Sequence, residues 1–106
     1  MRKKFDEELY KRVSINDLIM FSIYSLGYKC SFEELMKECF ASFPKVFSFS
    51  RNTKWPDARK LDRPLRSLRD KRLITGDPQT YFSLTKFGKK LAEDISKTFR
   101  QRKLFK

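Results

Sequence analysis

Residues 61–95 read LDRPLRSLRDKRLITGDPQTYFSLTKFGKKLAEDI, and this stretch decides the fold. Leucines at helical spacing predict a basic helix, and the two short runs at 73–75 and 81–84 predict the strands of a hairpin. The residues between the runs, Gly76-Asp77-Pro78-Gln79, are typical of a turn. Thr85 is then expected to cap a second helix. The side of that helix expected to be buried carries Phe87, Leu91 and Ile95.

The basic helix is predicted to begin near Pro56-Asp57, which suits a first helical turn. Its buried stripe comprises Ala58, Leu61, Leu65 and Leu68. At about 100° per residue, Arg59, Arg63 and Arg66 fall within a narrow arc on the opposite side, and Lys60, Ser67 and Lys71 flank this arc. Asp62 and Asp70, each four residues from Arg66, are expected to pair with its guanidinium.

Pro64 lies inside this predicted helix and leaves two alternatives open. A proline removes one helical hydrogen bond, so the helix either bends at this residue or begins at Asp62, with residues 56–61 forming a separate turn.

Two further helices are predicted upstream. Ser14 and Asp17 resemble a capping box, and the helix that follows, up to Gly27, is apolar on nearly all sides. Such a helix is either central and buried, or it lends its second face, with Met20, Phe21 and Tyr24, to a partner subunit. After a short extended segment at 28–30, Ser31 and Glu34 form a capping box for a helix that Pro44 ends.

The long connection between this helix and the basic helix is both aromatic and basic. Residues 46–50 alternate in polarity and form either a short strand or a packed loop. We expect the rings of Phe47, Phe49 and Trp55 to cover the core, because large apolar side chains near a core usually pack against it. The same connection carries Arg51 and Lys54, which are available for a polyanionic partner.

The 106 residues are enough for one domain with a modest core. We divide the chain into an N-terminal extension helix at 1–13, a central domain at 14–96, and a basic C-terminal extension at 97–106. The N-terminal helix is predicted from Phe5, Leu9 and Val13 at four-residue spacing. The C-terminal extension is open among three roles: an extra DNA contact, part of a dimer interface with 1–13, or a frayed tail.

Charge is strongly segregated along the chain. Residues 1–50 hold 8 Lys/Arg and 7 Asp/Glu, a balance of +1, whereas residues 51–106 hold 17 and 6, a balance of +11. Positive charge gathered on one half is the pattern expected of a protein whose partner is a polyanion.

Enzyme, metal and cofactor chemistry is not expected. The chain has no histidine and three glycines, so it lacks an acid–base pair and a phosphate-binding glycine loop. Cys30 and Cys39 are too few for a zinc site or a disulfide framework, and we expect reduced thiols in a cytoplasmic protein. No signal peptide is recognised, and the longest apolar run, 18–21, is far shorter than a membrane span.

The order of predicted elements, together with Leu84-Thr85-Lys86-Phe87-Gly88, resembles winged helix-turn-helix domains, many of which begin their last helix with a similar "LT..G" signature. The resemblance is to small bacterial and archaeal transcriptional regulators of this family. It implies a mainly α fold with a small β-hairpin wing and extra terminal helices. This chain departs from the pattern in its long connection at 44–55, in Arg72 where a glycine usually precedes the wing, and in a wing tip without Lys or Arg.

The resemblance and the charge together predict a DNA-binding transcriptional regulator that places helix 56–71 in the major groove of double-stranded DNA. The alternatives are a protein-interaction or assembly module and an RNA-binding domain. A homodimer is expected, whereas an effector ligand is left open. The residues expected to contact DNA are Arg51, Lys54, Arg59, Lys60, Arg63, Arg66, Ser67, Arg72, Lys86 and Lys90.

Overall fold

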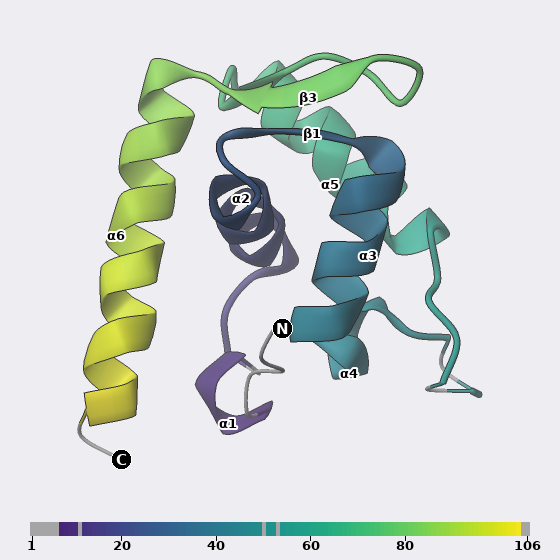
Figure 1. The fold of residues 1–106 in the computed structure, drawn as a ribbon, viewed down its shortest axis with the longest axis vertical. Helices are drawn as coiled ribbons and strands as arrows, with labels where there is room; N and C mark the ends of the chain where they lie inside the picture. Colours follow the sequence, from purple (N-terminus) through teal and green to yellow (C-terminus); the bar gives the residue numbers. More distant parts are fainter. Residues whose placement is uncertain (1–6, 11, 50, 53, 105–106) are drawn as a thin grey trace.

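A computed structural model describes residues 7–10, 12–49, 51–52 and 54–104 of the chain. This part is mainly helical and contains a small antiparallel sheet, as predicted (Figure 1). The elements follow in the order α1 (Glu7–Tyr10), α2 (Ile15–Ser25), β1 (Lys29–Ser31), α3 (Phe32–Ser42), α4 (Pro44–Phe47), α5 (Arg59–Asp70), β2 (Ile74–Thr75), β3 (Tyr81–Leu84) and α6 (Lys86–Leu104).

The sheet has three strands in the order β1-β3-β2. The predicted hairpin is confirmed, with Ile74 opposite Leu84 in an antiparallel pair. The short extended segment before α3 adds β1 to the other edge of β3, where Cys30 lies opposite Phe82. Figure 1 shows the sheet lying across one end of the helices, with α2 in the middle and α6 and α3 on either side of it.

Helix α2 is the centre of the core. It contacts α3, α5, α6 and β3, and its side chains from Leu18 to Ile23 are buried. Met20 and Phe21, on the face that a partner was expected to cover, are buried within this chain. The ring of Phe21 meets that of Phe99 from α6 in an edge-on contact, with 4.9 Å between centroids. The central, buried alternative is therefore confirmed, and this part of α2 is not available to a second subunit.

Side-chain caps begin three of the helices at the predicted residues. Ser14 Oγ accepts a hydrogen bond from the Asp17 N–H (3.2 Å), and Thr85 Oγ1 accepts one from the Gly88 N–H (3.1 Å). Ser31 and Glu34 form a complete capping box, in which each side chain accepts a hydrogen bond from the other residue's N–H. These caps satisfy backbone donors that have no partner inside the helix.

Helices α2 and α5 end with the same pattern of hydrogen bonds, although their sequences differ at the critical position. Each helix is followed by a residue with positive φ, Gly27 (91°) after α2 and Arg72 (60°) after α5. The next residue donates back into the last turn in both cases: Tyr28 N–H to Ile23 O (3.0 Å) and Leu73 N–H to Leu68 O (2.9 Å). This is the Schellman termination. Arg72 therefore adopts the left-handed conformation at the position where glycine usually precedes the wing.

The predicted buried side of α6 is wrong. Phe87 is 75% exposed and Leu91 is 44% exposed, while Ile95 is only partly buried. The helix packs instead through Gly88, Ala92 and Phe99. Close approach explains the preference for small residues, since a Cβ added to Gly88 would lie 2.0 Å from the Leu73 carbonyl oxygen.

The predicted boundary between residues 96 and 97 falls inside α6, which runs without interruption to Leu104. The frayed-tail alternative is therefore wrong for the residues up to 104. Phe99, within the predicted extension, is a core residue. Residues 105–106 lie outside the described part of the chain.

The N-terminal extension also differs from its prediction. A short α1 is present among residues 7–10, and its anchor is Tyr10, which belongs to none of the predicted stripe positions. The Tyr10 ring is fully buried edge-on against Phe43 (5.0 Å between centroids), and its hydroxyl accepts a hydrogen bond from the Lys45 N–H (3.4 Å). Val13 packs against the core as expected, whereas Phe5 and the Leu9 side chain lie outside the described residues.

The strand alternative for residues 46–50 is wrong. Pro44 does end α3, but it also occupies the first turn of α4, where its missing N–H costs nothing. Phe47, on this short helix, is fully buried as predicted, and Phe49 is half-buried. Trp55, in contrast, is 63% exposed, so the prediction that it packs on the core is wrong.

Candidate nucleic-acid interface

Helix α5 has one apolar face and one basic face. Leu61, Leu65 and Leu68 are buried in the core. Arg63 and Arg66 are exposed on the opposite side, as predicted. The expected ion pairs between Arg66 and the neighbouring aspartates are absent among the described residues, where the ion pair present on α5 joins Arg59 to Asp57. The guanidinium groups of Arg63 and Arg66 are therefore held by no carboxylate of this part of the chain.

Helix α5 is continuous through Pro64 and begins at Arg59, so the predicted starts near Pro56 and at Asp62 are both wrong. Ala58, predicted to lie on the buried stripe, precedes the helix and is exposed. A tight turn precedes the helix, in which Lys60 N–H donates to Asp57 O and Leu61 N–H donates to Ala58 O, both at 3.1 Å. Asp57 Oδ1 also accepts a hydrogen bond from the Arg59 N–H (3.1 Å). The continuous helix keeps the outward arginines in a fixed relation to one another.

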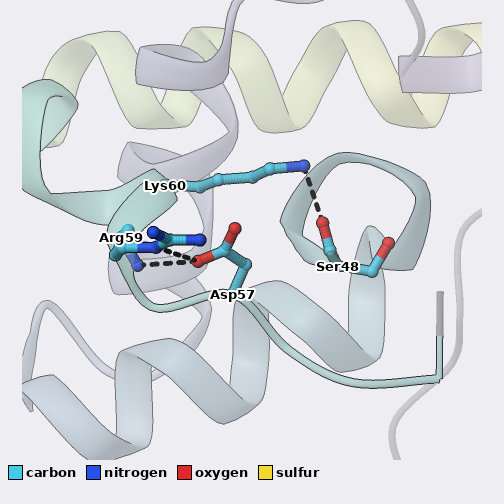
Figure 2. A network of polar contacts seen from close by, with 4 residues as sticks. All are labelled: Ser48, Asp57, Arg59 and Lys60. Atoms are coloured by element: carbon cyan, nitrogen blue, oxygen red, sulfur yellow. Dashed lines mark hydrogen bonds and ion pairs between the residues drawn. The ribbon is translucent and has the colours of Figure 1, made fainter. Parts of the chain in front are cut away.

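Arg59 is exposed but oriented by two neighbours, of which Figure 2 shows Asp57. Its side chain is 81% exposed, and its Nε lies 3.4 Å from Oδ1 of the buried Asp57. On the other side, the guanidinium carbon lies 5.9 Å from the centre of the Phe49 ring. A carboxylate and an aromatic face thus hold Arg59 at the start of the basic face.

Lys60 supports the interface from within the fold. Its ammonium donates a hydrogen bond to the carbonyl oxygen of the buried Ser48 (2.6 Å), as Figure 2 shows. The side chain is half-buried and reaches back towards the connection between α4 and α5. Lys60 was predicted to contact DNA, but its ammonium is directed to the protein backbone.

The remaining predicted residues lie on several elements and are not brought together at one point. Ser67 is half-buried on α5. The others are exposed: Arg51 and Lys54 in the connection before α5, Arg72 at the end of α5, and Lys86 and Lys90 in the first turns of α6.

Sequence reasoning missed Arg69, one helical turn after Arg66. Its Nη1 donates a hydrogen bond to the Gly76 carbonyl (3.0 Å), which ties α5 to the start of the hairpin turn. The signal available in the sequence was its position three residues after Arg66 on the same helix.

Helix α5 stands between two hollows of the surface. One, of about 320 Å³, lies between α5 and the hairpin, where Arg66 and Arg69 face Pro78 and Phe82. The other, of about 420 Å³, lies along the other side of α5 towards Ile15 and includes Arg59 and Arg63. The basic face therefore lies between the two hollows, and arginines line both of them.

The hairpin tip, residues 76–80, is held by local hydrogen bonds and carries no cation. Asp77 Oδ1 accepts hydrogen bonds from the N–H groups of Gln79 (2.8 Å) and Thr80 (3.0 Å). Gly76 has a φ of 102°, and a Cβ there would lie 1.8 Å from the Tyr81 carbonyl oxygen. Positive charge near the hairpin comes from the helices at its base.

The described residues show neither a metal site nor a cysteine thiol that is ionised at neutral pH. They contain no group of three His, Cys, Asp or Glu side chains placed to hold a metal ion. Cys30 and Cys39 are free and buried, and burial raises the pKa of each thiol to about 12, so neither is a thiolate at neutral pH. None of the described helices is both long and apolar enough to cross a bilayer.

No family model, curated protein or solved structure matches this chain. The function must therefore be inferred from the residues and geometry of the chain itself.

Proposed function

We propose that this chain is a winged helix-turn-helix protein that binds double-stranded DNA and regulates transcription. The order α2-β1-α3-α5-β2-β3-α6, with β3 between the other two strands, supports the fold assignment. Thr85 and Gly88, two residues of the motif that resembles the family signature, supply the cap of α6 and its close contact with Leu73.

The observation that carries the proposal is the exposed arginine face of α5 on a helix anchored by buried leucines. An α-helix fits the major groove of B-form DNA, and arginine can donate two hydrogen bonds to the O6 and N7 atoms of guanine. In this arrangement Arg63 and Arg66 meet base edges or phosphates. The exposed cations of Arg72, Lys86 and Lys90 contact the flanking phosphates.

The same observation makes the two alternatives less favourable. The major groove of an RNA duplex is deep and narrow, so an inserted helix cannot use it. A protein-interaction module would present apolar or mixed residues on the outer face of α5, whereas the exposed residues there are charged.

A homodimer in the cytoplasm is part of the proposal. A two-fold dimer would place two copies of α5 about 34–36 Å apart and would bind a palindromic site. The dimer needs a surface other than the buried face of α2. Light scattering with and without DNA measures the mass, and a monomer under both conditions would contradict the dimer.

A salt titration of binding to random duplex DNA tests the proposal without knowledge of the target sequence. The logarithm of the affinity should fall with the logarithm of the salt concentration, with a slope of about −0.9 for each neutralised phosphate. A chain that does not bind duplex DNA at low salt, or binds it with no salt dependence, is not a DNA-binding protein.

Two matched variants separate sequence recognition from phosphate contact once a cognate site is selected from a random pool. Arg63→Ala should weaken cognate binding by about 1–3 kcal/mol and relax the preference at one base position. Lys90→Ala should weaken binding to all duplexes equally. Equal losses on cognate and random DNA for Arg63→Ala would instead make Arg63 a phosphate contact.

A further inference from the structure

The connection between α4 and α5 holds an exposed tryptophan. Trp55 is 63% exposed, whereas Phe47, the last residue of α4, is fully buried. The exposed rings of Tyr28 and Tyr81 are each covered by a lysine ammonium, from Lys89 (5.2 Å) and Lys29 (5.1 Å). Within the described part of the chain, no cation lies over Trp55 and its indole makes no hydrogen bond.

Backbone hydrogen bonds fix the turn that carries Trp55. Trp55 accepts a hydrogen bond from the Phe49 N–H (3.0 Å) and donates one to the Asn52 carbonyl (3.2 Å). An antiparallel bridge joins Ser48 to Pro56, and the Asp57 N–H donates to the Phe47 carbonyl (2.8 Å). The Trp55 side chain therefore projects from a turn whose backbone is already ordered, so a ligand does not have to order the backbone here.

The charge around Trp55 is positive. Residues 48–56 contain Arg51 and Lys54 and no acidic residue, and both cations are exposed. The nearest acidic residue in the sequence, Asp57, is buried and paired with Arg59. An exposed aromatic ring in the same turn as two exposed cations is suited to a ligand that combines a flat ring with negative charge, as a nucleotide does.

The turn is connected to the basic face of α5 through direct contacts. The Phe49 N–H donates a hydrogen bond to the Trp55 carbonyl oxygen. The ring of Phe49 lies under the guanidinium of Arg59 at the start of α5. Lys60 ties the same turn to α5 through the Ser48 carbonyl. A nucleic acid bound along α5 would thus find Trp55 next to the end of the helix.

We propose that this turn is a second nucleic-acid site, in which the Trp55 ring stacks on an unpaired DNA base while Arg51 and Lys54 contact the adjoining phosphates. Bases inside a duplex have both faces covered by their neighbours, so a free ring face is offered by a bulge, a gap or a single-stranded end. The chain then prefers duplex DNA that contains unpaired bases. This inference rests on the proposed function insofar as α5 holds the adjacent duplex.

Trp55 is the single tryptophan of the chain, so its fluorescence reports directly on the site. The full chain is titrated at low salt with three DNAs that share one paired sequence. One is fully paired, the second has a central bulge of unpaired thymidines, and the third has a bulge of equal length made of abasic nucleotides. The abasic bulge keeps the phosphates of the thymidine bulge but offers no ring.

We expect the thymidine bulge to quench the indole emission and to bind roughly tenfold more tightly than the abasic bulge, in line with the strength of base–aromatic stacking. In binding assays with labelled DNA, Trp55→Ala should remove this difference and leave binding to paired DNA unchanged, and Trp55→Phe should retain part of it. Lys90→Ala is the matched control and should weaken binding to all three DNAs alike. Circular dichroism confirms that each variant is folded.

Equal affinity of the parent chain for the two bulges, or an unchanged emission, would overturn the inference whatever the affinity for paired DNA. If the parent chain prefers the thymidine bulge to the abasic bulge but does not bind the fully paired DNA, the proposed function is contradicted instead. Tighter binding to unpaired RNA than to unpaired DNA, or equal quenching by an acidic peptide, would also overturn the assignment of the site to DNA.

Discussion

Replacing Arg72 by glycine should stabilise the fold and weaken DNA binding at the same time. Arg72 has a φ of 60° in the Schellman termination of α5, a conformation that is strained for a residue with a Cβ. Its carbonyl accepts a hydrogen bond from Thr85 Oγ1 (2.7 Å), which a glycine would preserve. The exposed guanidinium makes no hydrogen bond or ion pair with the described residues, so its removal leaves no buried group without a partner.

Two opposing effects set the size of the change. The left-handed conformation costs an ordinary L-residue about 1–2 kcal/mol relative to glycine. Glycine in turn gives the unfolded chain more conformational freedom, which offsets about 0.4–1 kcal/mol of that gain. The free energy of unfolding should therefore rise by about 0.5–1 kcal/mol, which corresponds to an increase in Tm of about 2–8 °C for a domain of this size.

The chain contains its own control for this backbone effect. Gly27 ends α2 with a φ of 91°, and a Cβ there would have no atom within 4 Å. Gly27→Ala should thus lower the free energy of unfolding by about 0.5–1 kcal/mol through backbone strain alone. Arg72→Ala keeps the strain but removes the guanidinium, so it should melt close to the parent.

Thermal and urea unfolding measure stability, and a salt titration on duplex DNA measures binding. If Arg72 contacts one phosphate, both Arg72→Gly and Arg72→Ala should reduce the salt slope by about one unit. A clearly destabilised Arg72→Gly would refute the strain argument. Unchanged DNA affinity in both variants would refute the phosphate contact and leave the strain without a functional reason.

Three further predictions concern the core and the thiols. Phe99→Ala should lower the free energy of unfolding by about 3–5 kcal/mol, because it empties a buried site between α6 and α2. Phe87→Ala should change it by no more than about 0.5 kcal/mol, because the Phe87 ring is exposed. Equal losses for the two variants in urea unfolding would show that the exposed face of α6 is wrongly identified. Because burial raises the pKa of Cys39 to about 12, its thiol should resist thiol reagents at pH 8 until the chain unfolds. Stability should also fall as the pH rises from about 9 towards 12, where the thiol ionises in the unfolded chain first, and this fall should be shallower in Cys39→Ala.

The parts of the fold that follow from local chemistry were predicted from the sequence. Ser14, Ser31 and Thr85 cap helices at their predicted positions, because a capping hydroxyl acts on donors within the next three residues. The hairpin and the outward arginines of α5 also follow from spacing along one element. Such features depend on neighbours in the sequence, which periodicity and turn residues describe well.

The errors arise where distant segments decide the outcome. On α6, Phe87 and Leu91 form a more hydrophobic stripe than Gly88 and Ala92, yet the small residues face the core. Close approach to Leu73 admits no larger residue at position 88, and neither periodicity nor hydrophobicity encodes that distance. Likewise, Tyr10 is buried because its ring packs against Phe43 and its hydroxyl accepts a hydrogen bond from the Lys45 N–H. Both partners are more than thirty residues away in the sequence.

The candidate site was predicted only in part, because distant segments position some of its residues. Arg63 and Arg66 could be placed from the helical period alone. The inward turn of Lys60 depends on Ser48, and the exposure of Trp55 depends on a connection whose shape comes from α4 and the bridge at Pro56.

Helix α5 separates the residues that keep the protein folded from those that set the chemistry of its surface. Three of its twelve residues, Leu61, Leu65 and Leu68, are buried in the core. Substitutions at exposed positions such as 63 and 66 change stability little, since they disturb no packed contact. The outer face of α5 can therefore diversify while the scaffold persists. Related chains could share this architecture and yet differ entirely in the pattern that their α5 presents.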